Sequence, residues 1–118
     1  MDIETRIGNY SGSVDELVSH YSKDFFEIPF YDPKVVKRAL VVRDGSNNYQ
    51  VIISKDNRNP FYNIMVTIVG PNIKKIKEII KDLGEKLPIE LEPAPELTKQ
   101  FHKDMIRVAS LYYNAKNN

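Results

Sequence analysis

Two groups of side chains in this 118-residue chain are of types that bind ligands. The first group is apolar and aromatic, and it lies around Pro29, on a predicted strand and on the last predicted helix. An apolar pocket between a sheet and that helix would hold a small molecule by removing its apolar surface from water. The residues expected to line or gate the pocket are Phe30, Tyr62, Ile64, Val66, Phe101, Met105 and Tyr112. Our first hypothesis is therefore a protein that binds a small apolar molecule.

The second group is basic and could contact nucleic acid. Its members are Lys37, Arg38, Arg43, Lys55 and Arg58, with Tyr31, Tyr49 and Tyr62 close to them in the sequence. Basic groups hold phosphates and aromatic rings stack on bases in such interfaces. However, the net charge of the chain is only +1, and acidic residues are interspersed among these cations. We therefore favour the alternative that the cations block pairing at a sheet edge while the tyrosines pack half-buried.

No group of residues specifies a catalytic or metal site. His20 has Glu16 four residues before it and Asp24 four residues after it, but these three ligands do not complete a tetrahedral site. The same spacing is common on solvated helix faces. Two isolated histidines define no Ser–His–Asp triad, because triads depend on geometry rather than on sequence order. We accordingly predict no metal, no cofactor and no enzymatic activity.

The composition is that of a single globular domain over residues 1–118. With 42% hydrophobic and 28% charged residues, the chain has the balance of a folded protein. It contains no cysteine, which excludes disulfides and thiolate metal sites. The apolar runs are only a few residues long, against about 20 for a membrane span, and the acidic start has no apolar signal segment. We expect a cytoplasmic protein that does not enter a membrane.

The elements that must position these side chains begin with a strand and a helix. Ile3 to Ile7 alternate apolar and polar residues, which predicts a half-buried strand. Ser13 to Glu16 forms a capping box, and the apolar stripe behind it predicts a helix from residue 14 to about 25. The aromatic and proline-rich segment that follows is expected to turn, with Pro33 beginning a short helix capped by Asp32.

Three strands and a second long helix are expected next. The predicted strands are Ala39–Arg43, Tyr49–Ser54 and Tyr62–Val69. Residues 44–48 would join the first two as a hairpin, so that the three form an antiparallel meander with one buried side. Apolar residues at helical spacing predict a helix over 73–83, with Gly84 in the C′ position. Residues 87–91 then favour a short strand or an extended link.

The last predicted helix begins at Pro95, runs to about Tyr113 and is unusually apolar. One stripe consists of Leu97, Phe101, Met105, Val108 and Tyr112, and a neighbouring stripe consists of Ile106, Ala109 and Tyr113. One sheet face does not normally cover a stripe this wide. The second stripe is therefore expected to be sandwiched in the core, to meet a ligand, or to meet another subunit.

The order of these elements carries a family resemblance. It rests on the strand 3–7, the helix from Ser13, the segment 26–35, the three strands and the helix 97–113. This order resembles the helix-grip fold of the START/Bet v1-like superfamily. The resemblance implies a cavity between a curved sheet and the last helix that holds an apolar small molecule. The chain departs from that superfamily at residues 73–83, which favour a helix where further strands would be expected.

A second architecture fits the same elements. In a ferredoxin-like or ACT-like two-layer sandwich, the first and third helices would cover one sheet face. The second apolar stripe of the last helix would then form a homodimer seam or dock on another protein. Three functions thus remain open from the sequence: binding of an apolar small molecule, protein–protein interaction through the C-terminal helix, and weak nucleic-acid binding. The fold class in all three is α+β, with an antiparallel sheet packed against helices.

Overall fold

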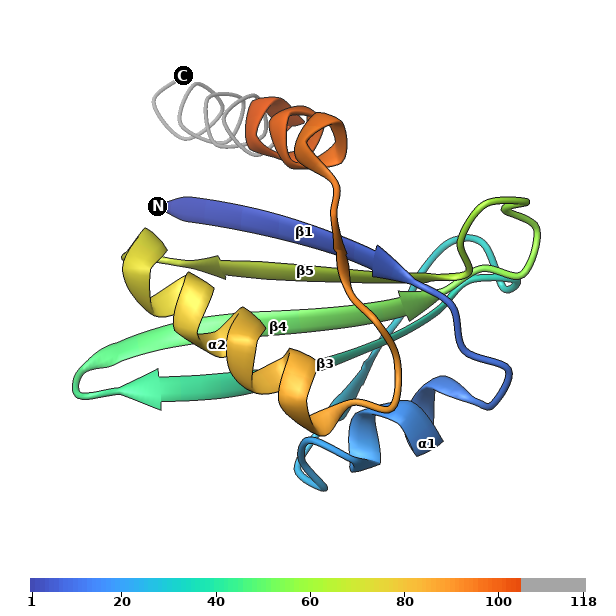
Figure 1. Ribbon diagram of the computed structural model, residues 1–118, viewed down its shortest axis with the longest axis horizontal. Helices are drawn as coiled ribbons and strands as arrows, with labels where there is room; N and C mark the ends of the chain where they lie inside the picture. The colour runs from blue at the N-terminus through green and yellow to red at the C-terminus, as the bar shows by residue number, and fades with distance from the viewer. Residues whose placement is uncertain (105–118) are drawn as a thin grey trace, which may run out of the picture.

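Six strands form one antiparallel sheet in the order β2-β3-β4-β5-β1-β6 (Figure 1). The computed structural model describes residues 1–104 of the chain. The strands are β1 (Asp2–Gly8), β2 (Phe26–Ile28), β3 (Val36–Asp44), β4 (Asn47–Lys55), β5 (Ile64–Gly70) and β6 (Glu92–Pro93). The predicted α+β class is confirmed, with the N-terminal strand added to a meander.

The helices α1 (Val14–Ser19) and α2 (Ile73–Lys86) pack on one face of the sheet, which we call the helical face. In Figure 1, α2 crosses in front of β4 and β3. Because side chains alternate along a strand, every second residue of β4 and β5 points into this layer. The buried strand residues of the layer are Tyr49, Val51, Ile53, Ile64, Val66 and Ile68. They meet Leu17, Val18, Ile76, Ile79 and Leu83 of the helices.

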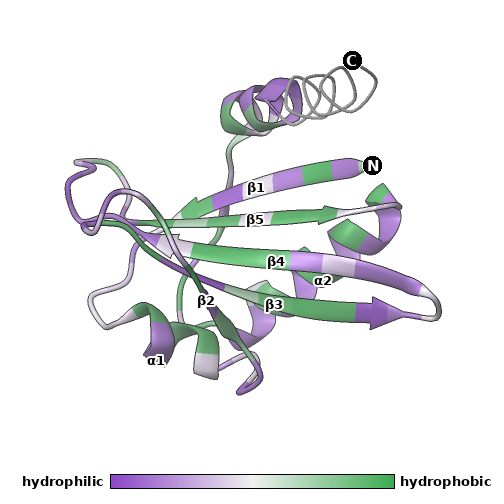
Figure 2. Ribbon diagram, turned by 180° about the vertical axis from the view of Figure 1, so that it is seen from behind, coloured by the Kyte–Doolittle hydropathy of each residue, from purple (hydrophilic) through white to green (hydrophobic). Residues whose placement is uncertain are grey.

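The opposite face of the sheet, which we call the open face, carries the alternate residues of the same strands (Figure 2). The register places Lys37 of β3 opposite Ser54 of β4, and Ser54 opposite Met65 of β5. Met65 in turn lies opposite Ile7 of β1. One row across four strands thus changes from charged to polar to apolar, and it forms the floor of the site described below.

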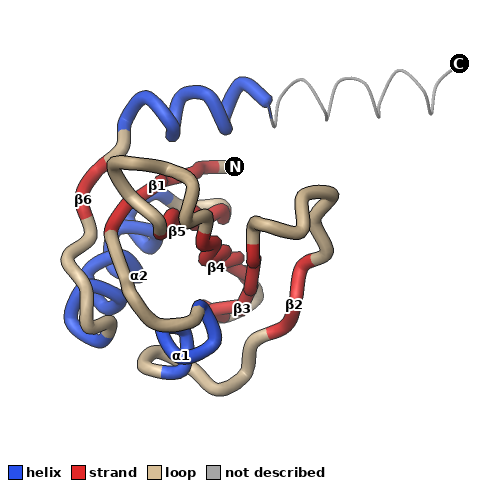
Figure 3. The backbone as a smooth tube through the Cα atoms, turned by 90° about the vertical axis from the view of Figure 1, so that its right-hand side faces the viewer, coloured by secondary structure: helices blue, strands red, loops and turns tan. Residues whose placement is uncertain are grey.

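Residues 95–104 form a helix at the β1 edge of the sheet, on neither the helical face nor the middle of the open face (Figure 3). The Thr98 hydroxyl oxygen accepts a hydrogen bond from the backbone N–H of Thr5 at 3.0 Å. The backbone N–H of Ala94 also donates to the carbonyl of Thr5, at 3.3 Å. These contacts fix the start of this helix against β1. Residues 106, 109 and 113, which form the second predicted stripe, lie outside the described residues.

The first helix is shorter than the sequence predicts. Ser13 caps it as expected, because its hydroxyl oxygen accepts from the N–H of Glu16 at 3.1 Å, but the helix ends at Ser19 rather than near residue 25. The apolar pattern continues through Tyr21 and Phe25 although the helix does not, because both side chains pack against the core from non-helical backbone. The next residues form β2 rather than a turn, as β-favouring aromatic and branched side chains allow.

The predicted short helix at Pro33 is wrong. The Asp32 carboxylate accepts from the N–H of Lys34 at 3.0 Å, which is the bond expected of a cap, but the chain makes only a turn there. β3 begins at Val36, where pairing with β2 and β4 outweighs the weak helix signal. Asp32 therefore accepts the backbone hydrogen bond that the sequence predicts, but it does so in a turn rather than at the start of a helix.

Two glycines also differ from their predicted roles. The β3–β4 hairpin has a two-residue turn, Gly45-Ser46, rather than a five-residue loop, and Gly45 has a φ of 61°. A glycine of positive φ at the first central position is the pattern of a type II′ turn, which suits the twist of a hairpin. Gly84 lies inside α2, which continues to Lys86, because Leu87 supplies the buried cap and donates its N–H to Leu83.

Candidate binding pocket

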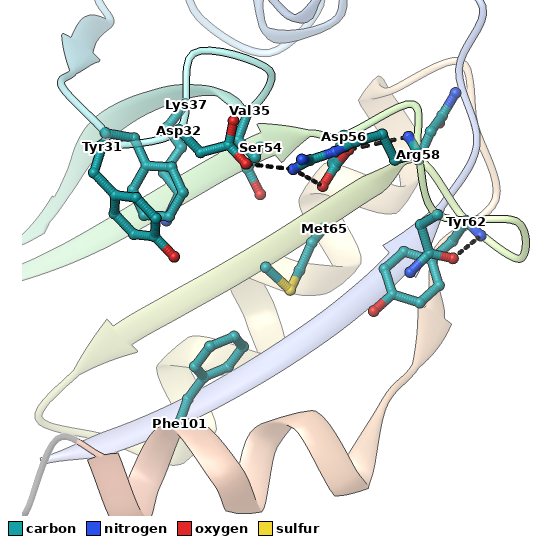
Figure 4. Close-up of a pocket in the computed structure, with 13 residues that line it drawn as sticks. Tyr31, Asp32, Val35, Lys37, Ser54, Asp56, Arg58, Tyr62, Met65 and Phe101 are labelled. Carbon is teal, nitrogen blue, oxygen red and sulfur yellow. Dashed lines mark hydrogen bonds and ion pairs between the residues drawn. The ribbon is translucent and has the colours of Figure 1, made fainter.

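A pocket of about 350 Å³ opens on the open face of the sheet (Figure 4). It lies between the strands, the segments around Tyr31 and Arg58, and the helix over 95–104. Its lining residues are Phe30, Tyr31, Asp32, Val35, Lys37, Ser54, Asp56, Arg58, Asn59, Tyr62, Asn63, Met65 and Phe101. This volume is at the small end of the roughly 300–1,000 Å³ usual for ligand sites.

The floor of the pocket is the row of strand residues that crosses the open face. Figure 4 shows Ser54 beside Lys37 at one end and Met65 toward the middle, with Phe101 facing Met65 from the helix. Ser54 is 6% exposed, so its hydroxyl lies below the rim of the pocket. The floor therefore offers hydrogen-bond donors at the β3 end and an apolar surface at the β5 end.

Aromatic rings form the wall at the β3 end. The ring centroids of Phe30 and Tyr31 are 4.4 Å apart in a tilted arrangement. The Lys37 ammonium lies 4.0 Å from the centroid of the Phe30 ring, within the range of a cation–π contact. Partial burial lowers the pKa of Lys37 below its ordinary value. Phe30 thus screens one side of the cation from water while the pocket lies on another.

Arg58 joins the two segments that form the mouth. Its Nη2 lies 2.6 Å from Oδ2 of Asp32 and 2.9 Å from Oδ2 of Asp56, while its Nε lies 2.9 Å from Oδ1 of Asp56. Hydrogen bonds from the Arg58 side chain and backbone hold the pKa of Asp56 down to about 2. The N–H of Lys34 and then the Arg58 guanidinium lower the pKa of Asp32. The mouth is therefore held by charges that stay ionised over the physiological pH range.

Three of the seven predicted apolar site residues line this pocket: Phe30, Tyr62 and Phe101. Ile64 and Val66 do not, because they point to the helical face and are 0% and 1% exposed in the core. Met105 and Tyr112 lie outside the described residues. The structure thus brings together three aromatic members of the predicted set, Phe30, Tyr62 and Phe101, and assigns the two aliphatic strand members to the core.

The five basic candidates do not form one surface. Lys37 and Arg58 line the pocket. Arg38 points to the helical face, where its Nε lies 2.7 Å from a carboxylate oxygen of Asp15 in α1. Lys55 donates to the backbone carbonyl of Gly12. Arg43 pairs with Asn48 beside the hairpin turn, at the other end of β3 from the pocket. Arg38 and Lys55 are therefore engaged in structural contacts away from the pocket.

Sequence reasoning missed the polar and sulfur-containing floor of the site, Ser54 and Met65. The signal that could have found them is the hairpin register. A two-residue turn at Gly45-Ser46 pairs Lys37 with Ser54, whereas the predicted five-residue loop slips the pairing by one residue and turns Ser54 to the other face. The Asp32–Arg58–Asp56 contacts link distant loops, and no sequence spacing indicates them.

Within residues 1–104, no three histidine or acidic side chains gather in a geometry that could hold a metal ion. Asp24 lies beyond the end of α1, so it does not share a helix face with Glu16 and His20. In the same part of the chain, no helix has the length and apolar character needed to cross a membrane. Comparison of the chain with protein-family models, curated proteins and solved structures found no match.

Proposed function

We propose that this protein is a non-catalytic binding protein that holds a small, largely apolar molecule in the pocket on the open face. The observation that carries the proposal is the convergence of Phe30, Tyr62 and Phe101 on one cavity of ligand size. They come from three separate parts of the chain, and each leaves part of its surface accessible. When a ligand covers the exposed aromatic surface around a cavity, that surface is removed from water, and the free energy of the complex is lowered.

The position of the pocket supports the same proposal. It is bounded by the sheet and, through Phe101, by the helix over 95–104, the two elements between which the resemblance to the helix-grip superfamily implies a ligand, although this helix lies at the β1 edge of the sheet. Met65 adds a flexible, polarisable side chain that adapts to ligands of different shape. The proposed activity therefore requires binding and release only, with no residue assigned to a chemical step.

A fluorescence titration with N-phenyl-1-naphthylamine, a neutral apolar probe, tests this function. We expect saturable binding at one site per chain. Phe101→Ala removes an apolar wall and should weaken binding roughly tenfold. Val35→Trp should also weaken it, because Val35 lines the pocket from a turn and a large ring there fills the cavity.

Phe61→Ala is the matched control, since Phe61 is 84% exposed and does not line this pocket. It should bind the probe as the unmodified protein does. Circular dichroism of each variant separates a lost pocket from a lost fold. Equal binding by the unmodified protein, Phe101→Ala and Val35→Trp would place the probe elsewhere and contradict the proposed site.

A further inference from the structure

The two cations that line the pocket differ in their partners. Arg58 contacts both Asp32 and Asp56, so its charge is matched within the protein. Lys37 forms no ion pair with any carboxylate of residues 1–104, and its contact is the face of the Phe30 ring. A partly buried ammonium without a counter-charge costs desolvation free energy that an anionic ligand would recover.

Ser54 gives a second, independent observation at the same place. Its side chain belongs to the small set of buried polar residues, at 6% exposure, and it lines the pocket. Its hydroxyl forms no hydrogen bond with the protein within residues 1–104, and its oxygen is not fully enclosed, because Thr5 Oγ1 is the only fully buried side-chain polar atom there without a partner. A hydroxyl that faces the pocket without a protein partner keeps its donor free for an acceptor group of a ligand, in the place of water.

Lys37 and Ser54 are directly opposed on neighbouring antiparallel strands. Cβ atoms of such pairs are about 4.5–5.5 Å apart, which allows one acceptor group to reach both side chains. We propose that the ligand of this pocket is a small carboxylic acid, whose carboxylate accepts hydrogen bonds from the Lys37 ammonium and the Ser54 hydroxyl. This inference rests on the proposed function and adds the chemical class of the ligand.

The rest of the pocket fits the apolar part of such an acid. From Ser54 the floor continues to Met65, which Phe101 faces from the helix (Figure 4). A planar, aromatic body would lie between these side chains, with its acidic group toward β3. Figure 4 shows Asp32 close to Ser54 and Lys37, so the net charge of −1 on the Asp32–Arg58–Asp56 group opposes an acid there, and the Lys37 ammonium has to offset this repulsion.

Three naphthalene derivatives of one size test the inference by displacement of N-phenyl-1-naphthylamine: 2-naphthoate, 2-naphthamide and 2-naphthylmethylamine. The acid should bind about tenfold or more tightly than the amide, as a charge-assisted hydrogen bond predicts. Lys37→Met should remove this preference without weakening the amide. Lys37→Arg keeps the cation and should restore much of the preference. Ser54→Ala should reduce it in part.

The outcomes separate the two proposals. Equal affinity of the unmodified protein for acid and amide, or tighter binding of the amine, overturns the acid anchor and leaves the pocket itself in place. An acid preference that survives in Lys37→Met also overturns it, because the anchor would then lie elsewhere. Failure of all four probes to bind overturns the pocket and with it the acid. Lys37→Gln is a second neutral variant, used if Lys37→Met loses the native circular dichroism spectrum.

Discussion

The backbone of Gly70 lies directly against the ring of Tyr49, so that a β-carbon at position 70 would overlap the Cδ1 and Cε1 atoms of that ring. Gly70 ends β5, and Tyr49 lies on the neighbouring strand β4 with 1% of its surface exposed. The large ring therefore occupies the volume that a side chain at position 70 would need. This contact closes the core at the hairpin end of the sheet.

Gly70→Ala should destabilise the protein for this reason. The added methyl group must displace a buried ring or bend β5, and overpacking of this kind costs roughly 1–3 kcal/mol. Chemical unfolding monitored by circular dichroism gives the change in the free energy of unfolding. The double variant Tyr49→Phe/Gly70→Ala should be no more stable than Gly70→Ala alone, because the added methyl group overlaps ring carbons of residue 49 rather than its hydroxyl group. Unchanged stability of Gly70→Ala would contradict the contact.

Gly84→Ala should have the opposite effect. Gly84 lies inside α2, is exposed, and has no atom near the position of an added β-carbon. Alanine is favoured over glycine in a helix interior by roughly 0.5–1 kcal/mol. The same unfolding experiment should show this gain in the free energy of unfolding. A loss of stability would indicate that the helix ends at Gly84, as the sequence alone suggests.

Thr98→Val tests how the helix over 95–104 is attached. The substitution removes the acceptor of the Thr5 N–H, and Thr5 is fully buried, so an unsatisfied donor would cost roughly 1–3 kcal/mol. Because Phe101 follows one turn later, probe binding to the pocket should weaken as well. Thr98→Ser keeps the hydroxyl and serves as the control. Equal stability of both variants would show that the hydrogen bond contributes little.

Tyr21 should titrate at unusually high pH. Burial, followed by the charge of the neighbouring Asp82 and a hydrogen bond to it, raises its pKa to about 12. The folded state favours the neutral phenol of Tyr21 more than the unfolded state does. This contribution to the free energy of unfolding is fully present below the ordinary pKa near 10 and is lost as the pH rises from there through about 12. Absorbance at alkaline pH should show this late step, and Tyr21→Phe should remove it. Asp82→Asn should move it to lower pH.

Asp32→Asn should strengthen the binding of 2-naphthoate. Asparagine keeps an acceptor for the Lys34 N–H while removing one negative charge from the mouth of the pocket. The gain should be roughly threefold, as expected for a charge several ångströms from the bound carboxylate. Binding of 2-naphthamide should not change. Asp24→Asn, at an exposed position that does not line the pocket, is the control.

Much of the sheet could be predicted from the sequence because alternation is a local signal. Local alternation predicts a strand over 62–69, of which 64–69 belong to β5 while Tyr62 and Asn63 precede it, and the capping box predicts Ser13 as the cap of α1. β2 was missed because a three-residue strand is stable only when paired with β3. The predicted helix end at Gly84 is wrong because tertiary packing decides it: Leu83 and Leu87 are buried, and α2 continues to Lys86.

The site was predictable only where large aromatic side chains indicate it. Phe30, Tyr62 and Phe101 were identified by type, but Ser54 needed the strand register, and the register depends on a turn of two residues. Arg58 was identified as a cation, yet its two carboxylate partners come from loops whose approach is a tertiary property. The sequence gives the chemical type of each side chain directly, whereas the distances between side chains depend on the whole fold.

The strand order has a consequence for synthesis of the chain on the ribosome. β1 is made early, but both of its neighbours, β5 and β6, are made much later. At ordinary translation rates, β1 waits roughly 3–12 s for the last residue of β5. The β3–β4 hairpin, by contrast, can close as soon as its second strand emerges, because a two-residue turn joins it. We therefore expect nascent chains to carry a first strand with one exposed apolar face, available to chaperones, until β5 has emerged.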